Sequence, residues 1–139
     1  MGCTTTQRTE QVLEAMDWYF GARECRSITF VNDTAGDQED LYFDLNAIDE
    51  NYAEKKYYVW LDAGTGTDPS VAGKTGIQVV YTSGDSASII AGLAQVAIDA
   101  VVNFNAEVSA AVVEIENKFL GDIATEDYSN AGSISGAVN

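Results

Sequence analysis

Carboxylates are almost the only side chains in this sequence that could do chemistry. The chain has 22 aspartates and glutamates, seven lysines and arginines, and no histidine. The lack of histidine excludes Ser-His-Asp and Cys-His catalysis and removes the commonest metal ligand. Two carboxylates could still serve as the acid and base of a glycosidase, but nothing in their spacing distinguishes one pair among 22. We therefore expect that the chain is not an enzyme and uses no cofactor.

Two motifs resemble ligand sites but are incomplete. Gly73-Lys74-Thr75 matches the end of a phosphate-binding P-loop, yet Asp68 occupies the position of its first glycine and a strand is expected to follow. The helix N-terminus that would hold a phosphate is therefore missing. A run of acids could attract calcium but lacks the glycine of an EF-hand loop: Asp37, Glu39, Asp40 and Asp44. A solvated acidic turn is the simpler interpretation of this run, and we expect no metal site.

The two cysteines, Cys3 and Cys25, flank a predicted helix over residues 9–20. Such a helix is about 18 Å long at 1.5 Å per residue, whereas a disulfide needs Cα atoms within about 7 Å. A bond within one chain would therefore require Cys3 to fold back along the helix. Cys25 lies between Arg23 and Arg26, whose charges favour the reactive thiolate. We favour a disulfide between subunits, with two free thiols as the alternative.

The excess of acids gives the chain a formal net charge of −15, and no base follows Lys118. Gripping nucleic acid requires lysines and arginines that neutralise phosphates, so this composition argues against binding of DNA or RNA. The same charge would suit a surface past which DNA slides without being held. The alternative is that the acidity only keeps the protein soluble.

The chain, at 139 residues, is most simply one domain with a substantial core. The sequence contains no run of 18 apolar residues, the length that a helix needs to span a membrane. The apolar spacing predicts helices over residues 9–20 and about 86–102, and alternating patterns predict strands at 27–32, 41–45, 57–63, 77–82 and 113–116. We expect an α+β fold, either a mainly antiparallel β sandwich or a partly closed barrel with two helices.

The expected core consists of apolar residues on consistent faces of these elements: Phe30, Phe43, Val59, Leu61, Ile77, Val79, Ile90, Leu93, Ala97 and Ile115. The single domain would have an N-terminal arm at residues 1–8 and a C-terminal arm or hairpin at 121–139. Both ends hold too few apolar residues to fold on the domain's own core. We therefore expect them to order against a neighbouring copy, which makes the protein a homo-oligomer.

The middle of the chain carries an ordered set of motifs. The aromatic strand YYVW (57–60) is followed by the loop GTGTDPSVAGKTGI (64–77), a short branched strand, and an Ala/Ile-rich helix that begins after GDSA (84–87). This set resembles a module in structural proteins of tailed bacteriophage virions, and the segment NAEVSAAVVEIEN (105–117) looks like the strand that follows the helix in such modules. Within that class the chain is most similar to a tail tube subunit of a contractile or long tail.

The resemblance implies small β domains that stack in rings, hexameric in the family, whose inner strands line a channel for DNA ejection. Its partners would be copies of itself and a tail sheath or other tail proteins, without a membrane. Its location would be the virion tail, after assembly in the bacterial host cytoplasm. Acids on exposed strand faces would line the channel and let DNA pass without tight binding: Asp44, Glu114 and Glu116.

The alternative function is that of a decoration or binding module on a capsid or fibre. Its loops would then recognise a neighbouring virion protein or a host glycan, to which exposed tryptophan and tyrosine side chains near an acidic loop would be suited.

Overall fold

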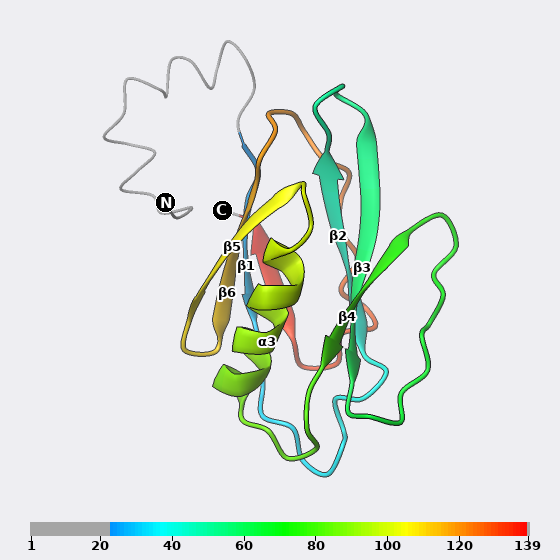
Figure 1. Cartoon of the computed structure of the whole chain (residues 1–139), viewed down its shortest axis with the longest axis vertical. Helices are drawn as coiled ribbons and strands as arrows, with labels where there is room; N and C mark the ends of the chain where they lie inside the picture. Colours follow the sequence, from blue (N-terminus) through cyan, green and yellow to red (C-terminus); the bar gives the residue numbers. More distant parts are fainter. Residues whose placement is uncertain (1–22, 139) are drawn as a thin grey trace.

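The structure is a computed structural model in which residues 23–138 are described. These residues form seven strands and one helix, and the strands belong to two separate sheets (Figure 1). Sheet A has the order β5-β6-β1-β7 and consists of β1 (Cys25–Thr29), β5 (Phe104–Ser109), β6 (Val112–Asn117) and β7 (Ser135–Val138). Sheet B has the order β2-β3-β4 and consists of β2 (Tyr42–Ile48), β3 (Glu54–Asp62) and β4 (Thr75–Val80).

The expected α+β class with mainly β structure is confirmed, and its finer details need correction. The two sheets are not closed into a barrel. Sheet B is mixed, because β4 runs parallel to β3 while β2 runs antiparallel to it. Helix α3 (Ala87–Asp99) ends three residues before the predicted limit at 102. The helix predicted over residues 9–20 and the arm at 1–8 lie outside the described residues.

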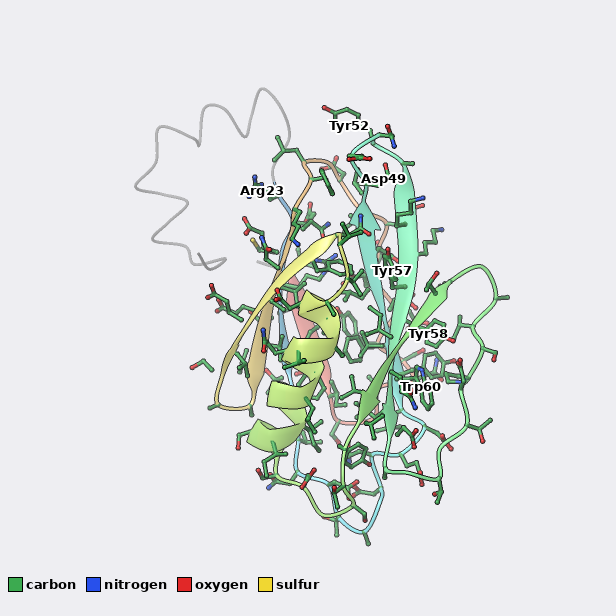
Figure 2. All side chains as sticks on the ribbon, viewed as in Figure 1. Arg23, Asp49, Tyr52, Tyr57, Tyr58 and Trp60 are labelled. Carbon is green, nitrogen blue, oxygen red and sulfur yellow. The ribbon has the colours of Figure 1, made fainter. Side chains whose placement is uncertain are left out.

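One core lies between the sheets, and β3 is buried on both of its faces. Val59 and Leu61 point into the core, whereas Tyr58 and Trp60 on the opposite face are covered as well. A parallel neighbour requires a long connection, and the connection 63–74 passes over this opposite face of β3. The Tyr58 hydroxyl donates to Asp68 Oδ1 of the connection at 2.5 Å, and Figure 2 shows both aromatic side chains beside it.

Helix α3 closes one side of the core. It packs against β4 of sheet B and against β5 and β6 of sheet A (Figure 1). Ser86 caps its N-terminus by accepting a hydrogen bond from the backbone N–H of Ile89. The inward residues are Ile90, Ala91, Ala94 and Ile98, whereas the outward face carries Ile89, Leu93 and Val96.

Most of the predicted core is buried, but the face of α3 was predicted wrongly. Leu93 is 38% exposed instead of buried, and Ala97 is only partly buried against the core. The inward and the outward face of α3 are both apolar, so the sequence pattern alone does not show which face is buried. The small side chains of Ala91 and Ala94 let the helix approach both sheets closely. The larger side chain of Leu93 on the packed face would hold the helix farther away. The predicted residues that are buried are Phe30, Phe43, Val59, Leu61, Ile77, Val79, Ile90 and Ile115.

The C-terminal segment 121–138 is neither a free arm nor a hairpin. Ala131 and Ile134 are buried in the core, and β7 pairs with β1. Val138 of β7 is exposed. The expectation that this segment cannot fold on its own domain is therefore wrong for residues 121–138. Its apolar residues are few, but a buried ion pair holds it in place.

That ion pair joins Arg26 of β1 to Glu126, with 2.7 Å between Arg26 Nε and Glu126 Oε1. The Arg26 guanidinium also donates to Asn117 Oδ1 at 3.1 and 3.2 Å and to the carbonyl of Asn46. Glu126 accepts from the Asn46 backbone N–H at 2.7 Å and from the Tyr128 hydroxyl at 2.8 Å. Burial raises the pKa of Glu126, and the charge of Arg26 opposes that shift. The network thus links β1, β2, β6 and the C-terminal segment.

Ile90→Ala and Leu93→Ala should separate the two faces of α3. Ile90 is fully buried, so its truncation should lower the free energy of unfolding by about 2–5 kcal/mol. Leu93→Ala should cost about 1 kcal/mol or less, because its side chain already contacts water. Urea denaturation of both variants measures this difference. Equal costs would show that α3 packs by the face that carries Leu93.

Arg26→Met should destabilise the fold by about 3–5 kcal/mol, because it leaves the Glu126 carboxylate buried without its charge partner. The double variant Arg26→Met/Glu126→Gln should recover part of that loss, since no buried charge remains. Denaturant titrations of the wild type and both variants provide the comparison. A loss below about 1 kcal/mol in the single variant would mean that the pair does not hold the segment.

Candidate assembly surfaces

The acidic turn at residues 33–40 contacts the connection 63–74. No group of three or more histidine, cysteine or acidic side chains among residues 23–138 is placed to hold a metal ion. In the predicted acidic turn, the carboxylates bind nearby backbone instead. Glu39 Oε1 accepts from the Thr65 N–H at 3.0 Å, and Asp40 Oδ1 accepts from the Thr67 N–H at 2.8 Å. These acids connect the turn at 33–40 to the connection 63–74.

The expectation that Asp44 is exposed is wrong. Asp44 lies on β2 and is buried, with Lys74 Nζ at 2.5 Å from its Oδ1 and the Asp127 N–H at 3.2 Å from its Oδ2. Lys74 belongs to the motif that resembles a P-loop, and its partner here is a carboxylate. The sequence pattern missed this pair because 30 residues separate the two side chains.

Glu114 and Glu116 lie on β6, and the structure places them differently. Glu114 is partly exposed. Glu116 is buried, with the Arg23 guanidinium 3.5 Å from its Oε1, so its expected exposure is wrong. A lumen role for either residue stays a prediction.

A glutamate that the sequence analysis did not single out lies next to Glu114. Glu107 of β5 is exposed and is the direct cross-strand partner of Glu114. Like charges placed directly opposite one another destabilise a sheet. The alternation of β5 and β6 puts Glu107, Glu114 and Glu116 on the outer face of sheet A, opposite the face that carries Phe104, Val113 and Ile115 into the core. The pairing of β5 with β6 brings these acids together.

Asp33 is a buried acid with a structural role. Its carboxylate accepts four hydrogen bonds, from the N–H groups of Gly36, Gln38 and Gly84 and from the Tyr81 hydroxyl. Burial alone would raise the pKa of Asp33, but the four donors outweigh burial and lower it to about 2. Asp33 therefore ties the turn at 33–40 to the turn before α3. An acidic turn was predicted at this position, but no local pattern indicated that Asp33 would be buried.

Cys25, at the start of β1, is buried and disulfide-bonded. Residues 23–138 contain no second cysteine, so the partner of this bond, like Cys3, lies outside the described residues. Whether Cys25 joins two subunits stays a prediction.

The tip of the β2–β3 hairpin presents an aromatic side chain to solvent. Tyr52 is 80% exposed and has a positive φ of 61°, a conformation that residues other than glycine adopt uncommonly. The tip is shaped by Asp49, whose Oδ1 accepts from the N–H groups of Asn51 and Ala53. A shallow hollow of about 370 Å³ beside the tip is lined in part by Asp49 and Tyr57. Figure 2 shows Tyr52 pointing away from the domain.

Comparisons with models of known protein families, with curated proteins and with solved structures found no match to this chain. No helix among residues 23–138 is long and apolar enough to cross a membrane.

The stability of the protein should fall as the pH drops from about 4 to 2, partly because of Asp33. Its folded pKa of about 2 is below the unfolded value of 3.8, so its contribution is complete above pH 4 and is lost as the pH approaches 2. Asp33→Asn should reduce this acid dependence and also lower stability at pH 7, because buried donors lose their acceptor. Urea midpoints at pH 7, 4 and 2.5 measure both effects.

Asp122→Asn is the matched control, because Asp122 is exposed. The role given to Asp33 fails if both variants follow the same pH profile.

Proposed function

We propose that this chain is a structural subunit of a tailed-phage virion, and specifically the tail tube subunit whose copies stack in rings around the path of DNA. The phage-like motifs correspond to one continuous part of the fold, namely β3, the connection 63–74, β4 and α3. That part forms most of sheet B and one side of the core. The resemblance therefore covers a structural unit rather than scattered residues, which supports the assignment to the virion class.

The observation that carries the tube proposal is the glutamate pair on sheet A. Glu107 of β5 and Glu114 of β6 are direct cross-strand neighbours on the outer face of sheet A. A channel wall that must not hold DNA offers a reason for this arrangement. Carboxylates repel phosphates within the Debye length, about 8 Å at physiological salt, and a net charge of −15 extends that repulsion over the subunit.

In this proposal the acidic wall consists of Glu107 and Glu114, and Asp44 is not part of it. Asp44 is neutralised by Lys74, and Glu116 is buried beside Arg23. The partners are copies of the chain and a sheath or other tail proteins. The protein assembles in the bacterial host cytoplasm and functions in the virion tail, where DNA passes without tight binding.

A second candidate function is a decoration or binding module on a capsid or fibre. The exposed Tyr52 at a constrained hairpin tip favours it, because aromatic side chains at loop tips stack on sugars or insert into partner pockets. The carboxylate of Asp49 and the hollow beside the tip add polar contacts to that surface.

Negative-stain electron microscopy of the purified protein distinguishes the two functions. Hollow tubes or rings with six-fold symmetry are expected for a tail tube subunit. Monodisperse monomers or trimers would contradict the tube and favour the binding module.

Replacing Glu107 and Glu114 with lysine should slow genome ejection from assembled particles, most strongly at low salt. The variant exchanges one like-charge pair for another, so the fold should persist, while the wall becomes attractive to phosphate. Ejection kinetics by dye entry into released DNA provide the measurement. The control is Glu50→Lys/Asp122→Lys, which makes the same charge change at two exposed loop positions. Equal ejection rates for the wild type and both double variants would exclude this strand face as the channel wall.

A further inference from the structure

Two of the four sheet edges are covered by the chain itself. The edge of β2 is bonded by the C-terminal segment, with Tyr42 N–H donating to the Asn130 carbonyl at 3.1 Å and Asp44 N–H donating to the Asp127 carbonyl at 2.9 Å. The edge of β5 is covered by α3. There the Ala106 N–H donates to Asp99 Oδ1 at 2.9 Å, and Gln95 Nε2 donates to the Ala106 carbonyl at 2.8 Å.

The other two edges, β4 and β7, are open among the described residues. Within residues 23–138, β4 pairs only with β3, and β7 pairs only with β1. Natural edge strands are normally protected from pairing with other chains by charged residues, proline or bulges. Neither TGIQVV of β4 nor SGAV of β7 contains a charged residue or a proline. Each strand instead ends in an exposed valine, Val80 or Val138.

The two open edges lie on opposite sides of the domain. β4 borders the side that α3 closes, because α3 packs against β4 and β5. β7 borders the other side, since it directly follows the segment that covers β2. In Figure 1, β4 is the labelled green strand and β7 is the red strand. Contacts between two different surfaces of one chain are head-to-tail, and they build rings or filaments rather than closed dimers.

We propose that the β7 edge of one copy pairs with the β4 edge of the next copy, so that sheet A of one subunit continues into sheet B of its neighbour. This inference rests on the proposed self-assembly and names the surfaces that perform it. A second copy fits because both edges are uncharged in a chain of net charge −15. These strands offer backbone hydrogen bonds and apolar side chains, without the repulsion that an acidic edge would meet on a second copy of the same chain.

Four valine-to-glutamate variants test the proposal at matched exposure. Val80 and Val138 lie on the open edges and are 56% and 64% exposed, whereas Val96 on the outer face of α3 and Val102 in the following turn are 65% and 72% exposed. Val80→Glu and Val138→Glu should each shift the assembled protein to monomer in sedimentation velocity. Val96→Glu and Val102→Glu should assemble like the wild type. Ser135→Glu repeats the test on β7 at a position farther from Arg26.

Mixing the variants tests the head-to-tail geometry and confirms that the variants are folded. Val80→Glu keeps an open β7, and Val138→Glu keeps an open β4. An equimolar mixture should therefore form a heterodimer, although neither variant associates alone. Self-association of Val80→Glu alone would indicate pairing of β7 with β7 and would overturn the proposed contact.

The outcomes separate this inference from the proposed function. If the wild type forms tubes that the edge variants do not disrupt, the edge pairing is wrong and the tube function stands. Loss of assembly only in Val96→Glu would assign the contact to α3 and would also overturn the proposal. Assembly that depends on the edges but gives filaments without a channel would support the pairing and contradict the tube. A wild type that stays monomeric at all concentrations would overturn both.

Discussion

The buried ion pair between Arg26 and Glu126 is the interaction on which the rest of the fold depends. Arg26 is fully buried in β1, and its guanidinium reaches β6 through Asn117 and β2 through the Asn46 carbonyl. A charge in this position is tolerated only while its partner is in place. The pair therefore fixes a segment with few apolar residues, and that segment covers the β2 edge before continuing as β7. One electrostatic contact thus holds the segment that covers the β2 edge and continues as the open β7 edge.

The acidic side chains of the described residues have different surroundings in the interior and on the surface. Three acids inside the fold are bound by donors: Lys74 is bound to Asp44, four donors surround Asp33, and Arg26 is bound to Glu126. The exposed Glu107 and the partly exposed Glu114 are cross-strand neighbours on the outer face of sheet A. Acids therefore contribute both to the interior contacts and to the surface of the described chain, and the proposed channel wall depends only on those at the surface.

The sequence predicted what depends on neighbouring residues and missed what depends on distant ones. Alternation located β3 and β4, and helical spacing located α3 within a few residues. The buried face of α3 was predicted wrongly, since only the packing of the two sheets decides which of its apolar faces is covered. The burial of Asp44 could not be predicted without its distant partner Lys74, and the docking of residues 121–138 on the domain could not be predicted without Arg26. Glu114 was recognised as a strand-face acid, but Glu107 and the open edges follow from strand pairing, which no local pattern encodes.

The connection 63–74 has a consequence for the motions of the domain. It forms a third layer over Tyr58 and Trp60, while β2 and β4 occupy both edges of β3 and the core fills its other face. The part of β3 from Tyr58 to Leu61 is therefore shielded from water in every direction. Amide protons there are expected to exchange only when β4 or the whole domain opens, whereas β7 belongs to the other sheet and can separate locally. Fluctuations at β7 thus leave the centre of sheet B closed, so a subunit can rearrange that edge on joining a neighbour without losing its fold.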